Sequence, residues 1–340
     1  MDTTTVVSLR KQRSVEAVSR RDFLRAAGAV AGVGGTTALS GCAGTQAAGA
    51  PVTVLAAGSL QRALETGLDS AVDVPVQVET HGSATVARMV AEGQRDPDIV
   101  TVADTALFEG VLSPAWYSVF TSNAVVLAYN PETEGGERVE RAGPERWYEP
   151  LLDDVDLGRT DPDQDPLGYR TLFALELASR YYGVPALREQ VPAREQVYPE
   201  TSLLTQFETG AIEAAFAYRN MAVERDYDYV DLPGEVDLSD PGHRERYATV
   251  TYELPGGQVV RGGPIGYAST LRRVTEGTLA VFEAHTTGSY LEDSGFLVRE
   301  GFPRYEGAVP DAVARAVGSD SGTAGRGGET PAGAVREVSD

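Results

Sequence analysis

The chain has 340 residues, with 29 basic and 50 acidic side chains and a formal net charge of −21 at pH 7. Such a polyanionic protein would repel nucleic acid, which is therefore excluded as a partner. The sequence holds a single cysteine, so no disulfide can form within the chain and stability must come from the core.

The first residues have the features of an export signal. The pair Arg20-Arg21 stands directly before an apolar leader that begins at Phe23, an arrangement typical of twin-arginine signals. The leader is mostly Ala and Gly and contains Arg25, so it is too weakly apolar for a spanning helix, which needs ~20 predominantly apolar residues. We expect residues 1–41 to be removed from the mature protein.

The only cysteine follows this leader and is the expected site of lipidation. Leu39-Ser40-Gly41-Cys42 looks like a lipobox, in which the cysteine becomes the lipidated first residue. We expect a flexible spacer over residues 42–50 and a protein held at the extracellular face of the cell membrane. The one lysine, Lys11, lies in the leader, so every later cation is arginine. An acidic surface without lysine resembles that of proteins from extreme halophiles, where salt screens the repulsion between carboxylates.

The chain after the spacer repeats a pattern of strand, turn and helix three times. Strands are expected at residues 51–57, 74–79 and 97–102, and helical patterns at 60–70, 84–92 and 105–110. The strands end at Gly58-Ser59, Gly82-Ser83 and Ala103-Asp104. This alternation predicts a parallel, doubly wound sheet, in which ligands bind beyond the carboxyl ends of the strands.

A long apolar strand over residues 118–129 is expected to leave this first sheet, and a second α/β unit follows it. Its predicted strands lie at residues 157–160 and 212–218, and its helices at 169–182, 203–209 and 220–225. Residues 258–260 and 264–268 are expected to return the chain, which ends in helices at 279–286 and 310–317. The predicted fold class is α/β, with two lobes joined by two crossover strands around a cleft.

The two crossover strands define the expected bounds of the lobes. We expect lobe I to comprise residues 51–123 and 256–317, and lobe II residues 124–255. The chain between the spacer and the tail is longer than one compact core usually spans. The tail over residues 318–340 is rich in Gly, Ser and Thr without periodicity, and we expect it to be disordered.

Two glycine–serine turns form the best-motivated site. Ser59 and Ser83 each follow a glycine at a strand end and begin a helix, whose unpaired N–H groups and partial positive charge suit an oxyanion. Ordinary N-capping by serine is the alternative interpretation of each turn alone. The three histidines are isolated, and neither a phosphate loop nor a nucleophile elbow is present. The sequence therefore favours a binding protein over an enzyme.

Asp165 stands at the start of a predicted helix and fits two roles. It can cap the helix with Pro166 at the first helical position, or it can point into the cleft. A carboxylate facing an oxyanion is normally repulsive. The second role therefore requires Asp165 to ligate the anion's central metal, to be protonated, or to accept a proton from the ligand.

Residues 52–317 resemble a known family, the archaeal tungstate/molybdate-binding proteins of ABC importers. The most specific motif is Asp165-Pro166-Leu167-Gly168-Tyr169-Arg170 before a helix. The resemblance also rests on short runs at residues 57–60, 82–83, 102–104, 123–129, 147–148 and 216–218. It implies a type II periplasmic-binding fold, no enzymatic activity, no cofactor, a membrane permease as partner and a monomeric state.

The resemblance also implies a set of binding residues for an oxyanion held between the lobes. Ser59 and Ser83 match the family's hydroxyl donors, and the backbone around Ala103 adds another. Asp165 matches a carboxylate ligand to the metal of the oxyanion. Tyr218 lies where the family lines the cleft from the second lobe.

One position departs from the family. Its members usually carry a second carboxylate ligand, a glutamate, directly before the tyrosine of the strand-end motif, where this chain has Ala217. Gln164 also replaces a frequent aspartate. A site without the second carboxylate is expected to hold a four-coordinate oxyanion or to prefer another anion, such as sulfate or phosphate. Glu213 and Glu224 lie nearby in sequence, but their positions do not favour either as a ligand.

Overall fold

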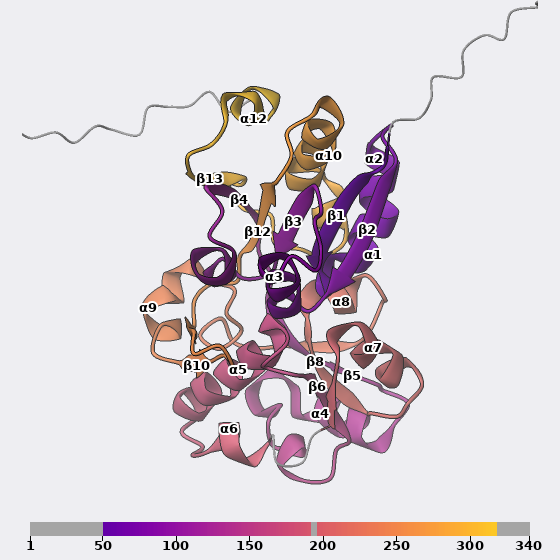
Figure 1. Ribbon diagram of the computed structural model, residues 1–340. Helices are drawn as coiled ribbons and strands as arrows, with labels where there is room; N and C mark the ends of the chain where they lie inside the picture. The colour runs from indigo at the N-terminus through magenta and orange to yellow at the C-terminus, as the bar shows by residue number, and fades with distance from the viewer. Residues whose placement is uncertain (1–49, 192–195, 318–340) are drawn as a thin grey trace, which may run out of the picture. The chain divides into compact units, whose positions relative to one another are not determined.

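The computed structural model describes residues 50–191 and 196–317, which belong to one compact unit (Figure 1). The predicted export signal over residues 1–41, the lipidation site Cys42 and the predicted tail over residues 318–340 lie outside the described residues. Within the described ranges, no helix combines the length and the apolar character that crossing a bilayer requires.

The first sheet has six strands in the order β13-β4-β12-β3-β1-β2. Their bounds are β1 Val52–Ala57, β2 Val76–His81, β3 Ile99–Val102, β4 Trp116–Thr121, β12 Tyr267–Leu271 and β13 Arg304–Gly307. As predicted, β1 pairs in parallel with both β2 and β3. The complete sheet is mixed, because β12, which comes later in the chain, is antiparallel to β3 and β4. β4 carries the chain toward the second sheet and β12 brings it back, so the two run in opposite directions.

Nine helical segments belong to the first part of the fold among the described residues. They are η2 Gly58–Leu60, α1 Gln61–Ala63, η3 Leu64–Leu68, α2 Asp69–Ala71, α3 Ser83–Ala91, η4 Phe108–Leu112, α10 Glu276–Thr287, α11 Tyr290–Asp293 and α12 Asp311–Ala316. α3 packs on β1, β2 and β3, and α10 packs on β1, β4 and β12. We name the six-stranded sheet with these helices the first lobe.

The second sheet has five strands in the order β7-β6-β8-β5-β9. Their bounds are β5 Val125–Tyr129, β6 Leu157–Thr160, β7 Gln196–Tyr198, β8 Ala214–Tyr218 and β9 Tyr229–Asp231. β6 is parallel to β7 and β8, whereas β5 is antiparallel to β8 and β9. β5 therefore runs away from the first lobe, and its neighbours run toward it.

The second lobe consists of this sheet with its helices, and a two-stranded ribbon follows them in the chain. The helices are α4 Glu134–Arg146, η5 Pro150–Leu152, α5 Pro166–Tyr182, α6 Leu187–Gln190, α7 Glu200–Glu208, α8 Arg219–Val223, η6 Pro241–His243 and α9 Arg244–Tyr247. The ribbon pairs β10, Thr251–Glu253, with β11, Val259–Arg261. α5 packs on β5, β6 and β8, and α7 packs on β6, β7 and β8.

Two segments connect the lobes, and they are hydrogen-bonded to each other. The strand predicted over residues 118–129 is in fact two strands, β4 and β5, which belong to different sheets and are separated by Ser122–Ala124. The Ser122 hydroxyl donates to the carbonyl oxygen of Ile265 at 2.7 Å, and Ile265 lies on the returning segment just before β12. Polar residues at the break satisfy the backbone where it leaves one sheet for the next.

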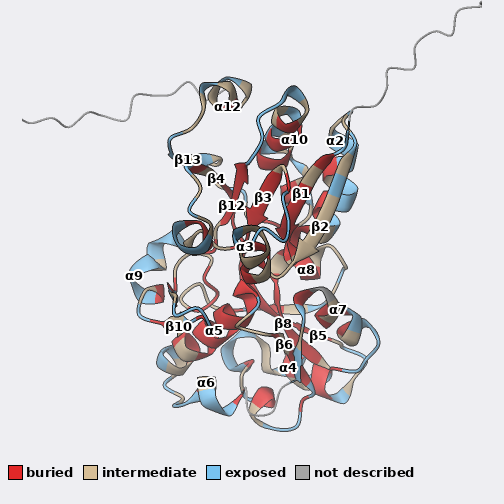
Figure 2. Cartoon of the chain, viewed as in Figure 1, coloured by how far each residue is buried: buried red, intermediate tan, exposed pale blue. Residues whose placement is uncertain are grey.

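The core lies in the strands of both sheets, which are mostly buried (Figure 2). Every residue of β3, β5, β8 and β12 is buried. Strands buried on both faces read as near-continuous apolar runs, as the AAFAY sequence of β8 does. Such rigid strands fix the positions of the turns that follow them.

Candidate functional site

Turns that follow strands of both sheets meet where the two lobes touch. From the first lobe come the turns after β1, β2 and β3, which hold Ser59, Ser83 and Ala103. From the second lobe, β6 leads to Asp165, β7 leads to Glu200, and β8 ends on Tyr218. We call this place the junction. It is the carboxyl-end region where α/β sheets bind ligands.

Asp165 is buried at the junction and caps α5. Its Oδ1 accepts hydrogen bonds from the Gly168 N–H at 3.1 Å and from the Thr160 hydroxyl at 2.8 Å. Burial raises the pKa of the Asp165 carboxyl to about 7, although both hydrogen bonds act against the rise. A Cβ placed on Gly82 would lie 2.7 Å from the Asp165 Cβ. The capping role is therefore present, and the same side chain lies against the second glycine–serine turn.

The two predicted serines are buried and already engaged within the protein. The Ser83 oxygen accepts a hydrogen bond from the Ala103 N–H at 2.9 Å, which leaves the Ser83 hydroxyl proton available to a ligand. The Ser59 hydroxyl and the Tyr267 hydroxyl lie 2.9 Å apart. The structure thus brings Ser59, Ser83 and Ala103 to one edge of the first lobe, as predicted for parallel strand ends.

The tyrosine and arginine of the sequence motif reach across the junction. The Tyr169 hydroxyl donates to Asp104 at 2.6 Å, and an Arg170 nitrogen lies 3.2 Å from the same carboxylate. Arg170 also donates to the Tyr218 hydroxyl at 2.7 Å. Burial raises the pKa of Tyr218, so the phenol stays neutral. The motif on α5 therefore ties Asp104 of the first lobe to Tyr218 of the second.

Ala217 is fully buried within β8, where it pairs with Val126. Side chains alternate along a strand, so Ala217 points away from the face that Tyr218 occupies. Because its side chain is a methyl group, Ala217 contributes no polar side-chain atom to the junction.

Glu200, the first residue of α7, also lies at the junction and was not predicted from the sequence. It is 4% exposed, and neither carboxylate oxygen has a hydrogen-bond partner among the residues that the structure describes. A Cβ placed on Gly58 would lie 2.6 Å from its Oε2, so the carboxylate faces the first glycine–serine turn. The sequence feature that could have located Glu200 is the pair Pro199-Glu200, because proline and an acidic residue commonly begin a helix.

A buried amide network beside the junction was also missed. The Asn123 side-chain amide donates to Asn220 Oδ1 at 2.8 Å and to the Tyr267 hydroxyl at 3.2 Å. Asn220 in turn donates to the backbone oxygen of Ser59 at 2.8 Å. The network links the Ser122–Ala124 crossover to the Ser59 turn. The sequence feature that could have indicated this network is Asn123, a polar residue between two apolar strands.

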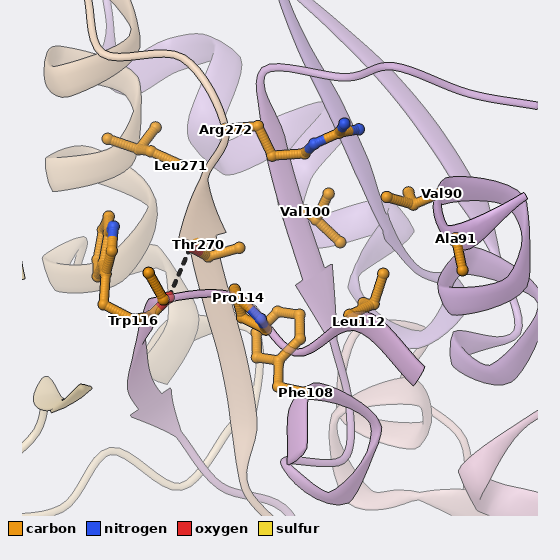
Figure 3. A pocket seen from close by; sticks show the side chains of 11 residues that line it. Val90, Ala91, Val100, Phe108, Leu112, Pro114, Trp116, Thr270, Leu271 and Arg272 are labelled. Carbon is orange, nitrogen blue, oxygen red and sulfur yellow. Dashed lines mark hydrogen bonds between the residues drawn. The ribbon is translucent and has the colours of Figure 1, made fainter. Parts of the chain in front are cut away.

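A separate cavity of about 410 Å³ lies in the first lobe (Figure 3). Its lining includes Phe108, Leu112, Trp116 and Arg272, and the Thr270 hydroxyl beside it donates to the Trp116 carbonyl at 2.8 Å. None of the predicted binding residues lines this cavity.

The fold and the junction define a two-lobed α/β binding protein, and similarity to known proteins specifies its family. Residues 52–253 match the family described as bacterial extracellular solute-binding proteins. The chain belongs to this family. It is therefore a solute-binding protein and not an enzyme, as the sequence analysis predicted.

Several relatives are known by sequence. A putative ABC transporter molybdenum-binding protein of Haloferax volcanii is 57% identical over 295 residues, which cover 86% of this chain and 96% of the relative. An uncharacterized solute-binding protein of Halobacterium salinarum is 35% identical over 88% of this chain and 98% of its own length. The molybdate/tungstate-binding protein WtpA of Thermococcus kodakarensis is 31% identical over 58% of this chain and 64% of its own length. These similarities confirm the predicted family resemblance.

A solved structure supports the fold. The periplasmic molybdate-binding protein of Azotobacter vinelandii superimposes with a TM-score of 0.52 and covers 73% of this chain and 100% of its own, at 11% identity. This similarity confirms the predicted type II periplasmic-binding fold.

Proposed function

We propose that this chain is the substrate-binding protein of an ABC importer and captures molybdate or tungstate between its lobes. The observation that carries the proposal is the junction, where two glycine–serine turns face buried groups of the second lobe. The names of the Haloferax and Thermococcus relatives support the choice of oxyanion. Lobe closure around the anion is the binding step, and no bond of the solute is broken.

Each predicted site residue has a role in this proposal. Ser83 donates its hydroxyl proton to the anion while its oxygen holds the Ala103 N–H. Ser59 donates from the first turn, where Tyr267 orients its hydroxyl. Tyr218 lines the site from the second lobe, held by Arg170. Asp165 ligates the metal centre of the oxyanion, which removes the repulsion that a carboxylate facing an anion otherwise causes.

The proposal places the protein outside the cell. Arg20-Arg21 and the leader support export by the twin-arginine route, and Cys42 supports a lipid anchor in the cell membrane. A monomer held there can deliver its solute to a membrane permease after closure. The relative from Haloferax, named as part of an ABC transporter, supports this partner.

Titration calorimetry of the full chain in molar KCl tests the proposal with molybdate, tungstate, sulfate and phosphate. We expect molybdate and tungstate to bind at least about 100-fold more tightly than the other two, a difference of roughly 2.7 kcal/mol. Tighter binding of sulfate or phosphate would instead support the alternative that Ala217 suggested.

A further inference from the structure

The two-stranded ribbon of β10 and β11, residues 251–261, is fastened to the second lobe at its base. The Tyr252 hydroxyl donates to Asp163 Oδ1 at 2.7 Å, and the Tyr252 ring stacks on the Tyr169 ring with 6.3 Å between centroids. A side chain of α6 also donates a hydrogen bond of 3.3 Å to the carbonyl oxygen of the first residue of β10. Asp163 and Tyr169 stand on either side of Asp165 in the sequence, so the base of the ribbon lies beside the junction.

The other end of the ribbon touches the first lobe. We call the turn that joins its strands, residues 254–258, the tip. Gln258 Nε2 donates to the Ala106 carbonyl oxygen at 2.9 Å, and Ala106 lies between β3 and η4. A Cβ placed on Gly110 of η4 would clash with the Gln258 amide, so the amide packs directly on this glycine. The ribbon therefore spans from the second lobe to the first.

The tip is held in shape by its own backbone. The Gly257 N–H donates to the Leu254 carbonyl at 2.8 Å, and the Leu254 N–H donates to the Gln258 carbonyl at 2.8 Å. Pro255 occupies the second position of this turn, where its ring fixes the backbone angle φ. A turn that is already ordered loses little conformational entropy when it docks. The tip can therefore bind and leave the first lobe as a preformed unit.

The apolar contact between the tip and the first lobe is incomplete. A cavity of about 110 Å³ lies between them. Its lining includes Ala84, Leu107 and Val111 of the first lobe and Leu254 and Pro255 of the tip. Protein surfaces that are fully complementary leave few voids of this kind. The two surfaces therefore meet without the close packing of a permanent interface.

The hydrogen bonding of Gln258 is incomplete as well. Its Oε1 is buried and has no hydrogen-bond partner among the residues that the structure describes. An unpaired buried acceptor costs at least as much free energy as one neutral hydrogen bond gains. When the lobes separate, water reaches both polar atoms of the amide. Docking of the tip is therefore finely balanced, which suits a contact that forms when the lobes close and breaks when they open.

We propose that the ribbon is a strap that holds the lobes closed around the bound solute, and that Gln258 fastens it to the first lobe. Undocking of the tip is then part of the step that opens the lobes, so the strap sets the rate at which the solute leaves. Gln258 acts on the solute only through the closed conformation and is a positioning residue. This inference rests on the proposed function, because molybdate is the probe in its test.

The test compares Gln258→Ala and Gln258→Glu with wild type, using the full chain in molar KCl. The release rate is measured with radiolabelled molybdate chased by unlabelled molybdate, and the association rate follows from that rate and the affinity. We expect Gln258→Ala to release molybdate at least about fivefold faster and to change association by less than about twofold, since contacts of the closed state act mainly on release. Gln258→Glu should release it faster still, because a buried carboxylate would face the Ala106 carbonyl.

Gln190→Ala is the matched control. The Gln190 amide also donates to a backbone carbonyl, that of Pro185 at 3.0 Å, but both residues belong to the second lobe. We expect this variant to release molybdate at the wild-type rate. Hydrogen exchange with saturating molybdate gives a second readout, in which Gln258→Ala should exchange faster at the tip and at residues 106–110 and Gln190→Ala should not.

Unchanged release in both Gln258 variants would overturn the strap while the proposed function stands. Slower release would also overturn it, because the ribbon would then oppose closure. Equally fast release by Gln190→Ala would attribute the effect to general destabilisation and reject the role of Gln258. Failure of the wild-type chain to bind molybdate or tungstate would reject the proposed function and the strap together.

Discussion

The imidazole of His285 is buried in the first lobe, where α10 packs on the sheet. Thr101 Oγ1 lies 3.0 Å from its Nε2, the Tyr290 hydroxyl lies 3.2 Å from its Nδ1, and the ring of Phe120 packs at 4.7 Å between centroids. Burial lowers the pKa of His285 to about 3, so the folded protein holds the ring neutral. The unfolded chain protonates the same ring near pH 6.5.

This difference predicts that His285 destabilises the fold in acid. Between pH 6.5 and 3 the unfolded state binds the extra proton, so the contribution of His285 to stability falls by about 1.4 kcal/mol per pH unit as pH decreases. Urea unfolding at several pH values, compared with His285→Gln, measures this slope. Glu224 has a pKa raised by burial to about 7 and acts in the opposite direction, so the comparison between variants is essential. Parallel stability curves for the two proteins would contradict the prediction.

Side chains that follow strand ends could be predicted from the sequence. Ser59, Ser83 and Asp165 meet at one junction in the structure, and the periodicity of the sequence had located the strand that precedes each of them. Glu200 was not predictable in the same way. The position of Glu200 at the junction follows from its contact with Gly58, which is distant in sequence. A helix that starts after a proline is common in any α/β protein and does not indicate such a contact.

Helix α5 contributes side-chain contacts that join the two lobes. Its first turn carries Asp165, and its next residues place Tyr169 and Arg170 against Asp104 of the first lobe. The far end of the same helix stays within the second lobe, where the Tyr182 hydroxyl donates to the Pro144 carbonyl at 2.7 Å. On this one helix, the Tyr169 hydroxyl thus bonds between the lobes and the Tyr182 hydroxyl bonds within a lobe.

Tyr169→Phe is expected to weaken oxyanion binding by about tenfold, because a hydrogen bond to a charged group contributes about 1.5–3 kcal/mol and this one closes the lobes. Tyr182→Phe is the control on the same helix. It should cost about 1 kcal/mol in unfolding free energy and leave binding unchanged. Calorimetric titration and thermal unfolding of both variants separate the two effects. Equal loss of affinity in both would show that the contact to Asp104 has no special role.

Elements were predicted better than their connections. The helix expected at residues 169–182 is present as α5, whereas the strand expected at 118–129 is two strands in two sheets. Ser122 and Asn123 interrupt the apolar run, but a short polar break between two buried strands does not by itself indicate a change of sheet. The antiparallel direction of β12 likewise follows from the return of the chain between lobes, which local sequence does not encode.

At the scale of the whole molecule, the net charge of −21 opposes folding at low ionic strength. The two-lobed α/β fold was predictable, because repeated strand–turn–helix units and a length beyond one core both indicate it. The bounds of the lobes, with residues 51–123 and 256–317 in one and 124–255 in the other, stay a proposal.

We expect the melting temperature of the full chain to rise by about 5–10 °C from about 0.3 M to about 3 M KCl, since salt shortens the range of repulsion between carboxylates to a few Å. Differential scanning calorimetry over a KCl series measures the rise. Sucrose at matched osmolality is the control, because it favours compact states without screening charge. An equal rise in sucrose would show that screening is not the cause.

The hydrogen bond between the Ser122 hydroxyl and the Ile265 carbonyl bears on how the importer recognises the protein. Two connecting segments without contact to each other would let the lobes twist and slide as well as open. A permease would then meet many relative orientations of the lobes. Because the two connecting segments are hydrogen-bonded side by side, we expect bending about them to be the easiest motion between the lobes. We expect a membrane partner to distinguish loaded from empty molecules by the angle of that bend.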